Sequence, residues 1–458
     1  LTDRETTVEA AVPYLLVCLL LLLVFAGVEI AVCLGVVSFI AIFYSTGDIG
    51  ISLSFLHSTA YEALRQYLFA VVPLFILMGQ FIAQSGAAAD LFWGLDRWLH
   101  RLPGRFAYAT VFGNVIFAFV TGTSLASATT FTAIAYPQMK RAGYDRHFSL
   151  GLISGSACLG MLIPPSLLLV VWGILTDISI GHLFLAGVIP GLVLAGLMIL
   201  YIFVVSMVRP DIVGQGVRFA QSKLDQSPDD VAAGAERPDP TFLDMTVSVV
   251  GLLAIMLGAL GGIWVGYFTP TEGAGIGALI ALLVGIAKGM RWPAIYQAVL
   301  LAGRTGIPLM IIIFAAQLYS RTLSMSGIGS TLQGALIGSG LSGWGTVAFM
   351  IVVWLVMGML IDSISIMLLT VPIFAPVAMQ LGLDPLVFAI AGILTIEAGL
   401  LTPPFGLIVY AVRSVVPDEE VSIKHIFIGS VPFCIILLLT VAIVLFAPAT
   451  VTFLTKFI

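Results

Sequence analysis

Two groups of oxygen-bearing residues stand inside otherwise apolar stretches of this sequence, and each group precedes a pair of adjacent prolines. The first group, ahead of Pro164 and Pro165, consists of Gly122, Thr123, Ser124, Ser127, Ser154 and Gly155. The second group, ahead of Pro403 and Pro404, consists of Asp362, Ser363, Ser365, Thr395, Glu397, Gly399 and Thr402. Hydroxyl, carboxylate and backbone carbonyl oxygens are the ligands that hard cations such as Na⁺ prefer. The sequence therefore predicts a cation site in each group.

The composition indicates a membrane protein. Of the 458 residues, 60% are hydrophobic and only 9% are charged, whereas soluble domains carry about 25% charged residues. A water-soluble fold could not cover this much apolar surface. The net charge of −5 and the lack of a basic stripe argue against nucleic acid as a partner. We therefore expect an all-α protein that crosses a lipid bilayer several times.

The apolar stretches predict the membrane-spanning helices, each of which needs about 20 residues. The candidate spans are 11–44, 64–84, 148–176, 186–207, 243–268, 272–288, 306–320, 386–416 and 428–450. Two further stretches, 105–139 and 343–380, are interrupted midway by TGTS and DSIS, which leaves arms of about 16 residues that are short for a crossing. We expect these two stretches to be re-entrant helical hairpins. Amphipathic interface helices are predicted at 86–102, 177–185, 291–304 and 418–427.

Basic residues indicate the side of the membrane to which each hairpin opens, because short cytoplasmic loops carry an excess of Lys and Arg. Both flanks of 105–139 are basic, so this hairpin is expected to face the cytoplasm. The flanks of 343–380 carry Arg321 alone, so this hairpin is expected to open to the outside. A polar cytoplasmic loop then separates two halves of the chain, and the three parts are 1–207, 208–242 and 243–458.

The two halves carry a repeated pattern. GMLIPPSLLLVVWG, which begins at Gly160, matches GLLTPPFGLIVYAV, which begins 239 positions later at Gly399. The same offset pairs Pro137 with Pro376, Gly143 with Gly382, and Asp145 with Asp384. An ungapped duplication of this length indicates an internal repeat. Since the charges place one hairpin inside and the other outside, we expect the two repeats to be inverted in the membrane.

Each proline pair lies in the middle of a candidate span, 148–176 or 386–416. Proline lacks a backbone N–H and keeps the preceding residue out of the α conformation, so both spans are predicted to be broken helices. Freed backbone groups are tolerated at membrane depth only where they line a cavity or are buried in protein. Inverted repeats whose broken helices meet re-entrant tips near the midplane are typical of secondary transporters.

This interpretation assigns roles to both groups of residues. The first Na⁺ site is predicted from Gly122, Ser124, Ser127, Ser154 and Gly155, and the second from Asp362, Ser365, Glu397, Gly399 and Thr402. The transported solute is expected to contact Thr123, Ser124, Ser363 and Thr395. Three alternatives stay open: the small residues serve only helix packing, Asp362 only caps a helix arm, or Glu397 pairs with a distant arginine. We expect Asp145 and Asp384 to be helix N-caps.

Five stretches that together cover nearly the whole chain carry a resemblance to a known family. They are VPLFILMGQFIAQSG (72–86), MKRAGYDRHFSLGLISGSACLGMLIPPS (139–166), SIGHLFLAGVIPG (179–191), GYFTPTEGAGIGA (266–278) and EAGLLTPPFGL (397–407). They resemble the large membrane subunit, of DctM type, of the tripartite ATP-independent periplasmic (TRAP) transporters. The sequence departs from the family pattern at the first hairpin tip, which reads TGTSLAS, and at Thr395, where many relatives have Asn.

The resemblance implies a fold, partners and a mechanism. Such subunits lie in the bacterial inner membrane and work with a small four-helix membrane subunit and a periplasmic substrate-binding protein. Na⁺ drives the import of an organic acid, such as a C4-dicarboxylate or a sialic acid. A scaffold supports an elevator-type transport domain that carries both hairpins, with the Na⁺ sites between each hairpin tip and the matching helix break.

Other functional classes fit less well. Asp362 stands in GMLID and not in the GxGD context of intramembrane aspartyl proteases, and the HExxH pattern of zinc proteases is absent. We therefore expect no enzymatic activity. The predicted function is Na⁺-coupled import of a small organic acid. The alternative is a stand-alone Na⁺- or H⁺-coupled organic-anion carrier with a similar inverted-hairpin fold.

Overall fold

The computed structural model describes residues 2–214, 242–338, 340–416 and 421–457, and within these ranges the fold is all-helical apart from one isolated bridge. The helices of the first half are α1 (Thr2–Phe25), α2 (Ile30–Thr46), α3 (Ile49–Arg65), η1 (Tyr67–Ala70), α4 (Val71–Ser85), α5 (Ala87–Trp98), α6 (Arg105–Thr121), α7 (Ser124–Arg141), α8 (Arg146–Ala157), α9 (Leu159–Leu162), α10 (Leu167–Thr176), α11 (Ile180–Val208) and η2 (Pro210–Ile212). Those of the second half are α13 (Phe242–Ile255), η3 (Met256–Gly261), α14 (Gly262–Trp264), α15 (Pro270–Ala287), α16 (Trp292–Met325), α17 (Ile328–Ile337), α18 (Gly343–Gly358), α19 (Ser363–Gln380), α20 (Pro385–Gly399), α21 (Leu407–Val415), α22 (Ile423–Phe446), α23 (Ala449–Thr452) and η4 (Leu454–Phe457).

The described helices include seven that are long and apolar enough to cross a membrane. An eighth span results if α8–α9 and α10, which meet at 41°, are counted as one bent helix. The prediction of an all-α protein with several membrane spans is therefore confirmed.

The internal repeat extends over most of the described chain. The offset between the repeats is 239 residues, which is also the separation between Cys158 and Glu397. When this offset is added to the residue numbers of the first half, its helices match helices of the second half in chain order: α1 and α13, α2 and α15, α5 and α17, α6 and α18, α7 and α19, α8 and α20, α10 and α21, and α11 and α22. The packing follows the same symmetry. Helix α10 packs against α19, and its counterpart α21 packs against α7. Likewise α8 packs against α22, and α20 packs against α11.

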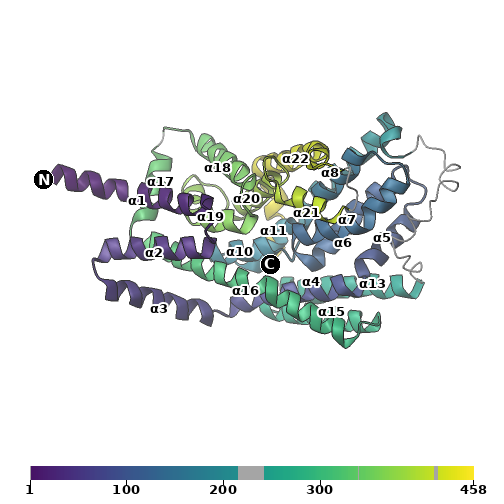
Figure 1. Cartoon of the computed structure of the whole chain (residues 1–458), viewed down its shortest axis with the longest axis horizontal. Helices are drawn as coiled ribbons and strands as arrows, with labels where there is room; N and C mark the ends of the chain where they lie inside the picture. The colour runs from purple at the N-terminus through teal and green to yellow at the C-terminus, as the bar shows by residue number, and fades with distance from the viewer. Residues whose placement is uncertain (1, 215–241, 339, 417–420, 458) are drawn as a thin grey trace.

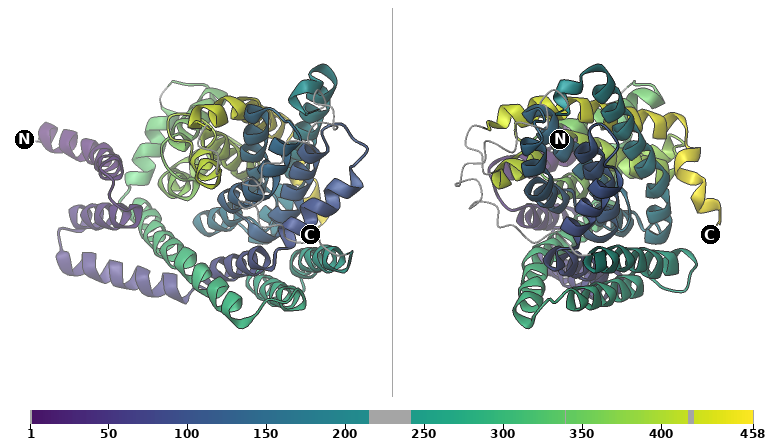
Figure 2. Two further views of the ribbon diagram at one scale, coloured as in Figure 1. Left: turned by 45° about the vertical axis from the view of Figure 1, so that its right-hand side comes forward. Right: turned by 90° about the vertical axis from the view of Figure 1, so that its right-hand side faces the viewer.

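The helices form two connected parts. A helix layer, consisting of α2, α3, α4, α13, α15 and α16, lies along the lower edge of Figure 1 and is again visible below the rest of the protein in Figure 2. The body above it contains hairpin 1 (α6–α7), hairpin 2 (α18–α19), the first broken helix (α8–α10) and the second broken helix (α20–α21). Helix α5 leads from the layer to hairpin 1, and α17 leads from the layer to hairpin 2.

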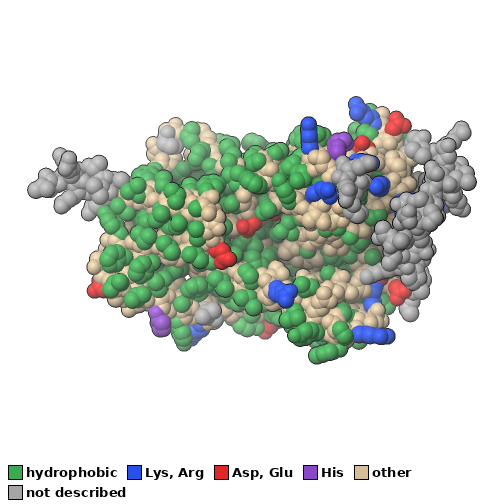
Figure 3. Space-filling model, in the orientation of Figure 1, with side chains coloured by type: hydrophobic (Ala, Val, Ile, Leu, Met, Phe, Trp, Pro, Cys, Tyr) green, Lys and Arg blue, Asp and Glu red, His purple; other side chains and the backbone are tan. Residues whose placement is uncertain are grey.

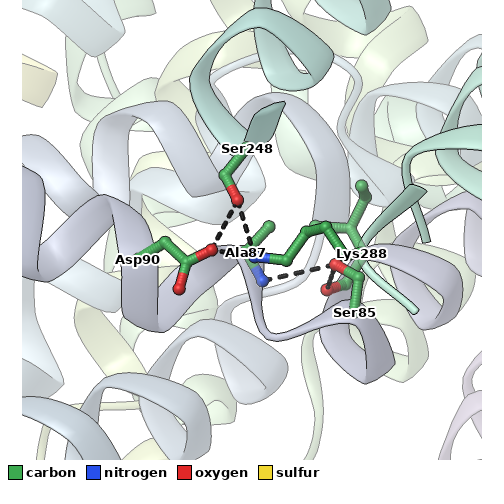
Figure 4. Close-up of polar contacts among 6 residues, drawn as sticks. Ser85, Ala87, Asp90, Ser248 and Lys288 are labelled. Atoms are coloured by element: carbon green, nitrogen blue, oxygen red, sulfur yellow. Dashed lines mark hydrogen bonds and ion pairs between the residues drawn. The ribbon is translucent and has the colours of Figure 1, made fainter. Parts of the chain in front are cut away.

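A buried ion pair fastens α5 to the helix layer. Lys288, at the end of α15, pairs with Asp90 of α5 and donates a hydrogen bond of 2.7 Å to Ser248 of α13 (Figure 4). The Ser248 hydroxyl in turn donates to Asp90 Oδ2 at 2.7 Å. The side chains of Lys288 and Asp90 are only 7% and 13% exposed. Three helices are therefore held together by one polar cluster.

The centre of the body is an aromatic cluster that joins the two repeats. Trp172 of α10 and Trp354 of α18 are fully buried, and their ring centroids are 6.0 Å apart. Phe388 of α20 packs against Trp354 at 5.0 Å. Large buried rings dominate the packing energy of such a core. The cluster thus fixes the half-helix that follows one proline break against elements of the other repeat.

Several predicted elements differ from the structure. The long span 11–44 is interrupted between Phe25 and Ile30, and α3 is an additional helix. Because α3 contains polar residues throughout, a criterion based on apolar length overlooks it. The interface helices predicted at 177–185 and 291–304 are wrong, since Ile180 begins α11 and Trp292 begins the 34-residue α16.

The remaining linking segments gave mixed outcomes. The helix predicted in 86–102 is confirmed as α5 (Ala87–Trp98), although its position at the membrane interface stays a prediction. Of 418–427, residues 421–422 precede α22 and Ile423 begins it, while 417–420 lie outside the described residues. Most of the predicted 208–242 loop, 215–241, also lies outside them. The sides of the membrane to which the hairpins open stay predictions.

Candidate functional site

The tip of hairpin 1 packs directly on the first proline break. Gly122, between α6 and α7, has a φ of +61°, and a Cβ at this position would lie 2.5 Å from the carbonyl oxygen of Pro165. The Leu167 N–H donates to the Gly122 carbonyl at 3.1 Å. Only glycine combines this backbone conformation with such close contact. The chain thereby joins the hairpin tip to the backbone of the broken helix.

Hairpin 2 meets the second break in a similar way. The Phe405 N–H, just after the second proline pair, donates to the carbonyl of Met359 at the hairpin tip at 3.2 Å. Gly358 of α18 and Gly399 of α20 face each other so closely that a Cβ on Gly358 would lie 2.8 Å from the Gly399 Cα. Each proline break is therefore covered by the tip of the hairpin from its own repeat.

The carboxyl group of Glu397 lies where the two repeats meet. Its side chain is buried, and Ser363 donates a hydrogen bond of 2.8 Å to Oε1. The Ser124 hydroxyl lies beside the same carboxyl group without forming a well-aligned hydrogen bond. Ser124 and Ser363 are repeat counterparts, and each is the first residue of the second hairpin arm, α7 or α19. A carboxylate near helix N-termini is electrostatically favoured.

Two buried oxygens at this junction have unused hydrogen-bonding capacity. Glu397 Oε2 and Ser124 Oγ have no hydrogen-bond partner among the described residues. Buried polar atoms normally find partners, and exceptions call for an explanation. Lone pairs of this kind suit a cation ligand.

Asp362 adopts the alternative role that the sequence left open. It is the N-cap of α19, where its carboxylate accepts a hydrogen bond of 3.0 Å from the Ser365 N–H and another from the Ser365 hydroxyl. The predicted caps Asp145 and Asp384 are likewise confirmed. Capping uses only part of the capacity of a carboxylate, which has about four lone-pair positions. Asp362 can therefore cap α19 and still offer oxygen to an ion.

Other predicted site residues face away from the tips or bond to their own helices. Gly155 packs against Phe433 of α22, where a Cβ would lie 2.3 Å from the Phe433 Cβ, and its carbonyl accepts from the Cys158 N–H. The hydroxyls of three others donate to carbonyls four residues earlier: Ser154 to Leu150, Thr395 to Ala391, and Thr402 to Ala398. By contrast, Thr123 and Ser127 lie together against Gly160 at the first break.

Two residues near the site were absent from the sequence prediction. Cys158 is the repeat counterpart of Glu397, and its Sγ lies 4.0 Å from the Glu397 carbonyl oxygen. The repeat offset would have identified it. Asn114 of α6 donates to Ser156 of α8 at 2.8 Å, while its Oδ1 has no partner among the described residues. Asn114 could have been selected from the sequence because it is an amide side chain within an otherwise apolar hairpin arm.

A polar cavity of about 340 Å³ lies between the body and the helix layer. Its walls are the end of α10, α16, α17 and α19. The polar side chains that line it are Thr176, Asp177, Ser320, Ser324, Ser330 and Gln333. Pro372 and Pro376 of α19 also line it, and proline leaves a helix carbonyl without its usual N–H partner. The cavity thus presents hydroxyl and amide groups and the carboxylate of Asp177, next to apolar side chains of the same helices.

Comparison with known proteins identifies the family. Residues 16–450 match the family described as "Tripartite ATP-independent periplasmic transporter, DctM component". The chain belongs to this family. This TRAP large permease is 31% identical to the C4-dicarboxylate TRAP transporter large permease protein DctM of Pseudomonas aeruginosa, over 85% of this chain and 86% of that protein.

Two further similarities are informative. The chain is 25% identical to the isethionate TRAP transporter permease protein DctMQ of Oleidesulfovibrio alaskensis, over 92% of this chain and 63% of that longer protein. The crystal structure of the Alcanivorax borkumensis YdaH transporter matches with a TM-score of 0.64 at 16% identity, over 86% of this chain and 88% of that chain. That second likeness shows a shared fold. The TRAP large permease is thus a multi-pass inner-membrane transport protein and not an enzyme.

Proposed function

We propose that this TRAP large permease couples Na⁺ entry to the import of a small organic acid delivered by a periplasmic binding protein. The observation that carries the proposal is the convergence of both hairpin tips on Glu397, next to the two proline breaks. The names of the two relatives given above support the substrate class, because both C4-dicarboxylates and isethionate are organic acids.

The Na⁺ sites in this proposal are the two tips. The first uses oxygens of Gly122, Ser124 and Ser127, whereas the predicted ligands Ser154 and Gly155 use their polar groups within their own helix. The second uses Asp362, Ser365, Glu397, Gly399 and Thr402. The unsatisfied oxygens of Ser124 and Glu397 support this assignment, since the donor set consists of hydroxyl, carboxylate and carbonyl groups that suit a hard cation.

The solute would bind where the N-termini of α7 and α19 approach each other, near Thr123, Ser124, Ser363 and Thr395. Helix N-termini attract anionic groups such as a carboxylate. The polar cavity beside Asp177 supports an approach route from the side of the membrane at which α10 ends. That cavity is lined by hydroxyl and amide groups, apolar side chains and the carboxylate of Asp177, without lysine or arginine, so it would not retain an anion.

The movement in this proposal is that of an elevator, in which the body moves against the helix layer. The two-part arrangement in Figures 1 and 2 and the connecting helices α5 and α17 support it. Lys and Arg side chains gather toward the right-hand end of the surface in Figure 3, which supports a cytoplasmic position for that end.

Two partners complete the transporter. A small four-helix membrane subunit would pack on the permease, and the greater length of the DctMQ relative supports an additional membrane part in such systems. The periplasmic binding protein would deliver the solute.

The test is uptake by the permease reconstituted with its small subunit and binding protein in liposomes, against a panel of labelled organic acids. We expect uptake of at least one acid that requires both an inward Na⁺ gradient and the binding protein. Uptake that persists without the binding protein would favour the stand-alone carrier. Uptake driven by a proton gradient alone would remove Na⁺ from the mechanism.

A further inference from the structure

An apolar groove lies between α5, hairpin 1 and the helix layer, and none of the residues assigned to the ion and solute sites lines it. Its volume is about 550 Å³. The residues that line it are Leu91, Gly94, Leu95 and Trp98 of α5, Ile116 and Phe119 of α6, and Met245, Thr246, Val249, Val250, Leu252, Leu253 and Met256 from α13 and the start of η3. Apart from Thr246, every lining side chain except that of glycine is hydrophobic. The groove is thus suited to an apolar ligand.

The groove has the length of one membrane leaflet. Its wall follows α13 from Met245 to Met256, a distance of about 16 Å at 1.5 Å per helical residue. Half of the hydrocarbon core of a bilayer is about 15 Å thick. Val250 and Leu253 are 58% and 45% exposed, so the groove is open at the side of the protein. An acyl chain in one leaflet would therefore extend along its whole length.

The mouth of the groove has the character of a membrane interface. Trp98, at the end of α5, is 75% exposed, and tryptophan concentrates at the level of the lipid headgroups. The exposed Arg101 follows three residues later, in the turn that leads to α6. Lys288 is not available to a lipid headgroup, because its amine is buried and already pairs with Asp90 and Ser248 (Figure 4). Arg101 is therefore the basic side chain that a phosphate at this mouth would meet.

We propose that this groove binds one acyl chain of a membrane phospholipid, with the phosphate headgroup held at the mouth near Trp98 and Arg101. Apolar walls, leaflet length and a basic aromatic mouth reproduce the order of groups along a phospholipid molecule. The groove joins two parts of the protein, because Ile116 and Phe119 belong to hairpin 1 whereas Val249 and Leu252 belong to the helix layer. The bound lipid would fill the space between them.

The test uses a phosphatidylglycerol with a photoactivatable diazirine in one acyl chain, added to the purified full-length permease in nanodiscs. After illumination, mass spectrometry locates the labelled residues. We expect labelling along α13 from Val249 to Met256 and on Phe119 of α6. Val250→Trp and Gly94→Phe, which fill the groove from opposite walls, should each lower this labelling at least about tenfold, since an acyl chain gains binding from each methylene that the groove buries.

Leu279→Trp is the matched control, because Leu279 is an exposed residue of α15 that does not line the groove. It should leave the labelling of α13 unchanged. Arg101→Gln should weaken retention of the lipid without moving the labelled residues. Two different groove-filling variants are used so that the test still works if one of them fails to fold. Size-exclusion chromatography would reveal such a failure.

Two results would overturn the proposal. One is labelling of α13 that stays the same in both groove-filling variants, which would indicate unspecific contact with surrounding lipid. The other is a side chain or helix of the small subunit occupying the groove in the purified complex. Neither result bears on Na⁺-coupled uptake, so this test is independent of the proposed function.

Discussion

The Ser363 hydroxyl donates a hydrogen bond of 2.8 Å to the buried carboxyl group of Glu397. This contact joins the first residue of α19, at the tip of hairpin 2, to α20 immediately before the second proline break. Ser124, the repeat counterpart of Ser363, lies beside the same carboxyl group. One acidic side chain therefore contacts both hairpins, so a substitution at Glu397 or at either serine would alter the packing of both repeats.

Ser363→Ala should destabilise the permease by about 1–3 kcal/mol, because a buried carboxyl group loses its donor. Thermal unfolding of the purified protein in detergent measures this. Ser430→Ala is the control, since the buried Ser430 hydroxyl only donates to Ile426 of its own helix at 2.8 Å. Equal losses in the two variants would show that the contact with Glu397 has no special importance.

Asp362→Asn and Ser124→Ala should each raise the Na⁺ concentration needed for half-maximal uptake, by at least about tenfold for the loss of an ion ligand. Uptake into proteoliposomes at a series of Na⁺ concentrations measures the change. Asp384→Asn is the matched control, because Asp384 is also an aspartate that caps a helix, but at the end of α20 far from the break. Unchanged Na⁺ activation in both site variants would remove these residues from the ion sites.

Gly122→Ala should abolish uptake and lower stability by more than about 1 kcal/mol, since alanine is strained at positive φ and its Cβ would overlap the Pro165 carbonyl. Gly196→Ala, in the middle of α11, meets no atom within 4 Å and should be neutral or slightly stabilising. Transport and thermal unfolding of the two variants can be compared directly. Normal transport by Gly122→Ala would contradict the close packing of tip and break.

Lys288→Met should destabilise the protein by about 3–5 kcal/mol, because it leaves the carboxylate of Asp90 buried without its cation. Removing the more exposed pair between Arg321 and Glu62 should cost only about 0–1 kcal/mol. A double-mutant cycle with Asp90→Asn measures the coupling of the buried pair. Additive effects of the two substitutions would show that the pair contributes no interaction of its own.

The stability of the permease should depend on the ionisation of Asp96, a buried residue of α5 that pairs with Arg105 at 2.9 Å. Burial raises the pKa of Asp96, and the nearby charges of Arg105, Arg97 and His100 oppose this rise. An acid with a raised pKa binds its proton more tightly in the folded state. Its contribution to stability is therefore full below the ordinary pKa of about 3.9 and is lost as the pH rises through the folded value.

Asp96→Asn should remove this pH dependence. Between pH 4 and neutral pH, the melting temperature of the wild type should fall relative to that of the variant. Parallel melting curves over the whole range would contradict the raised pKa.

The sequence alone was sufficient for the all-α membrane fold, the two hairpins, the two broken helices and the family. These features follow from local properties: apolar length, turn residues between hairpin arms, and proline at mid-span. The 239-residue offset also showed which helices of the two halves correspond, because a duplicated sequence folds into a duplicated structure. The caps Asp145, Asp384 and Asp362 were also within reach, since capping is decided within one helical turn.

Only the tertiary structure decided which oxygens meet. Ser363 and Glu397 are 34 positions apart, and Cys158 and Glu397 are 239 apart, so no local rule brings them together. Gly155 is a further example, because nothing in the sequence around Ser154 and Gly155 indicates that Gly155 packs on Phe433. Helix rotation and packing between distant elements determine which face of each helix looks toward the break. The residue types thus predicted oxygen ligands for a cation, whereas side-chain contacts between the two repeats determined where these oxygens lie.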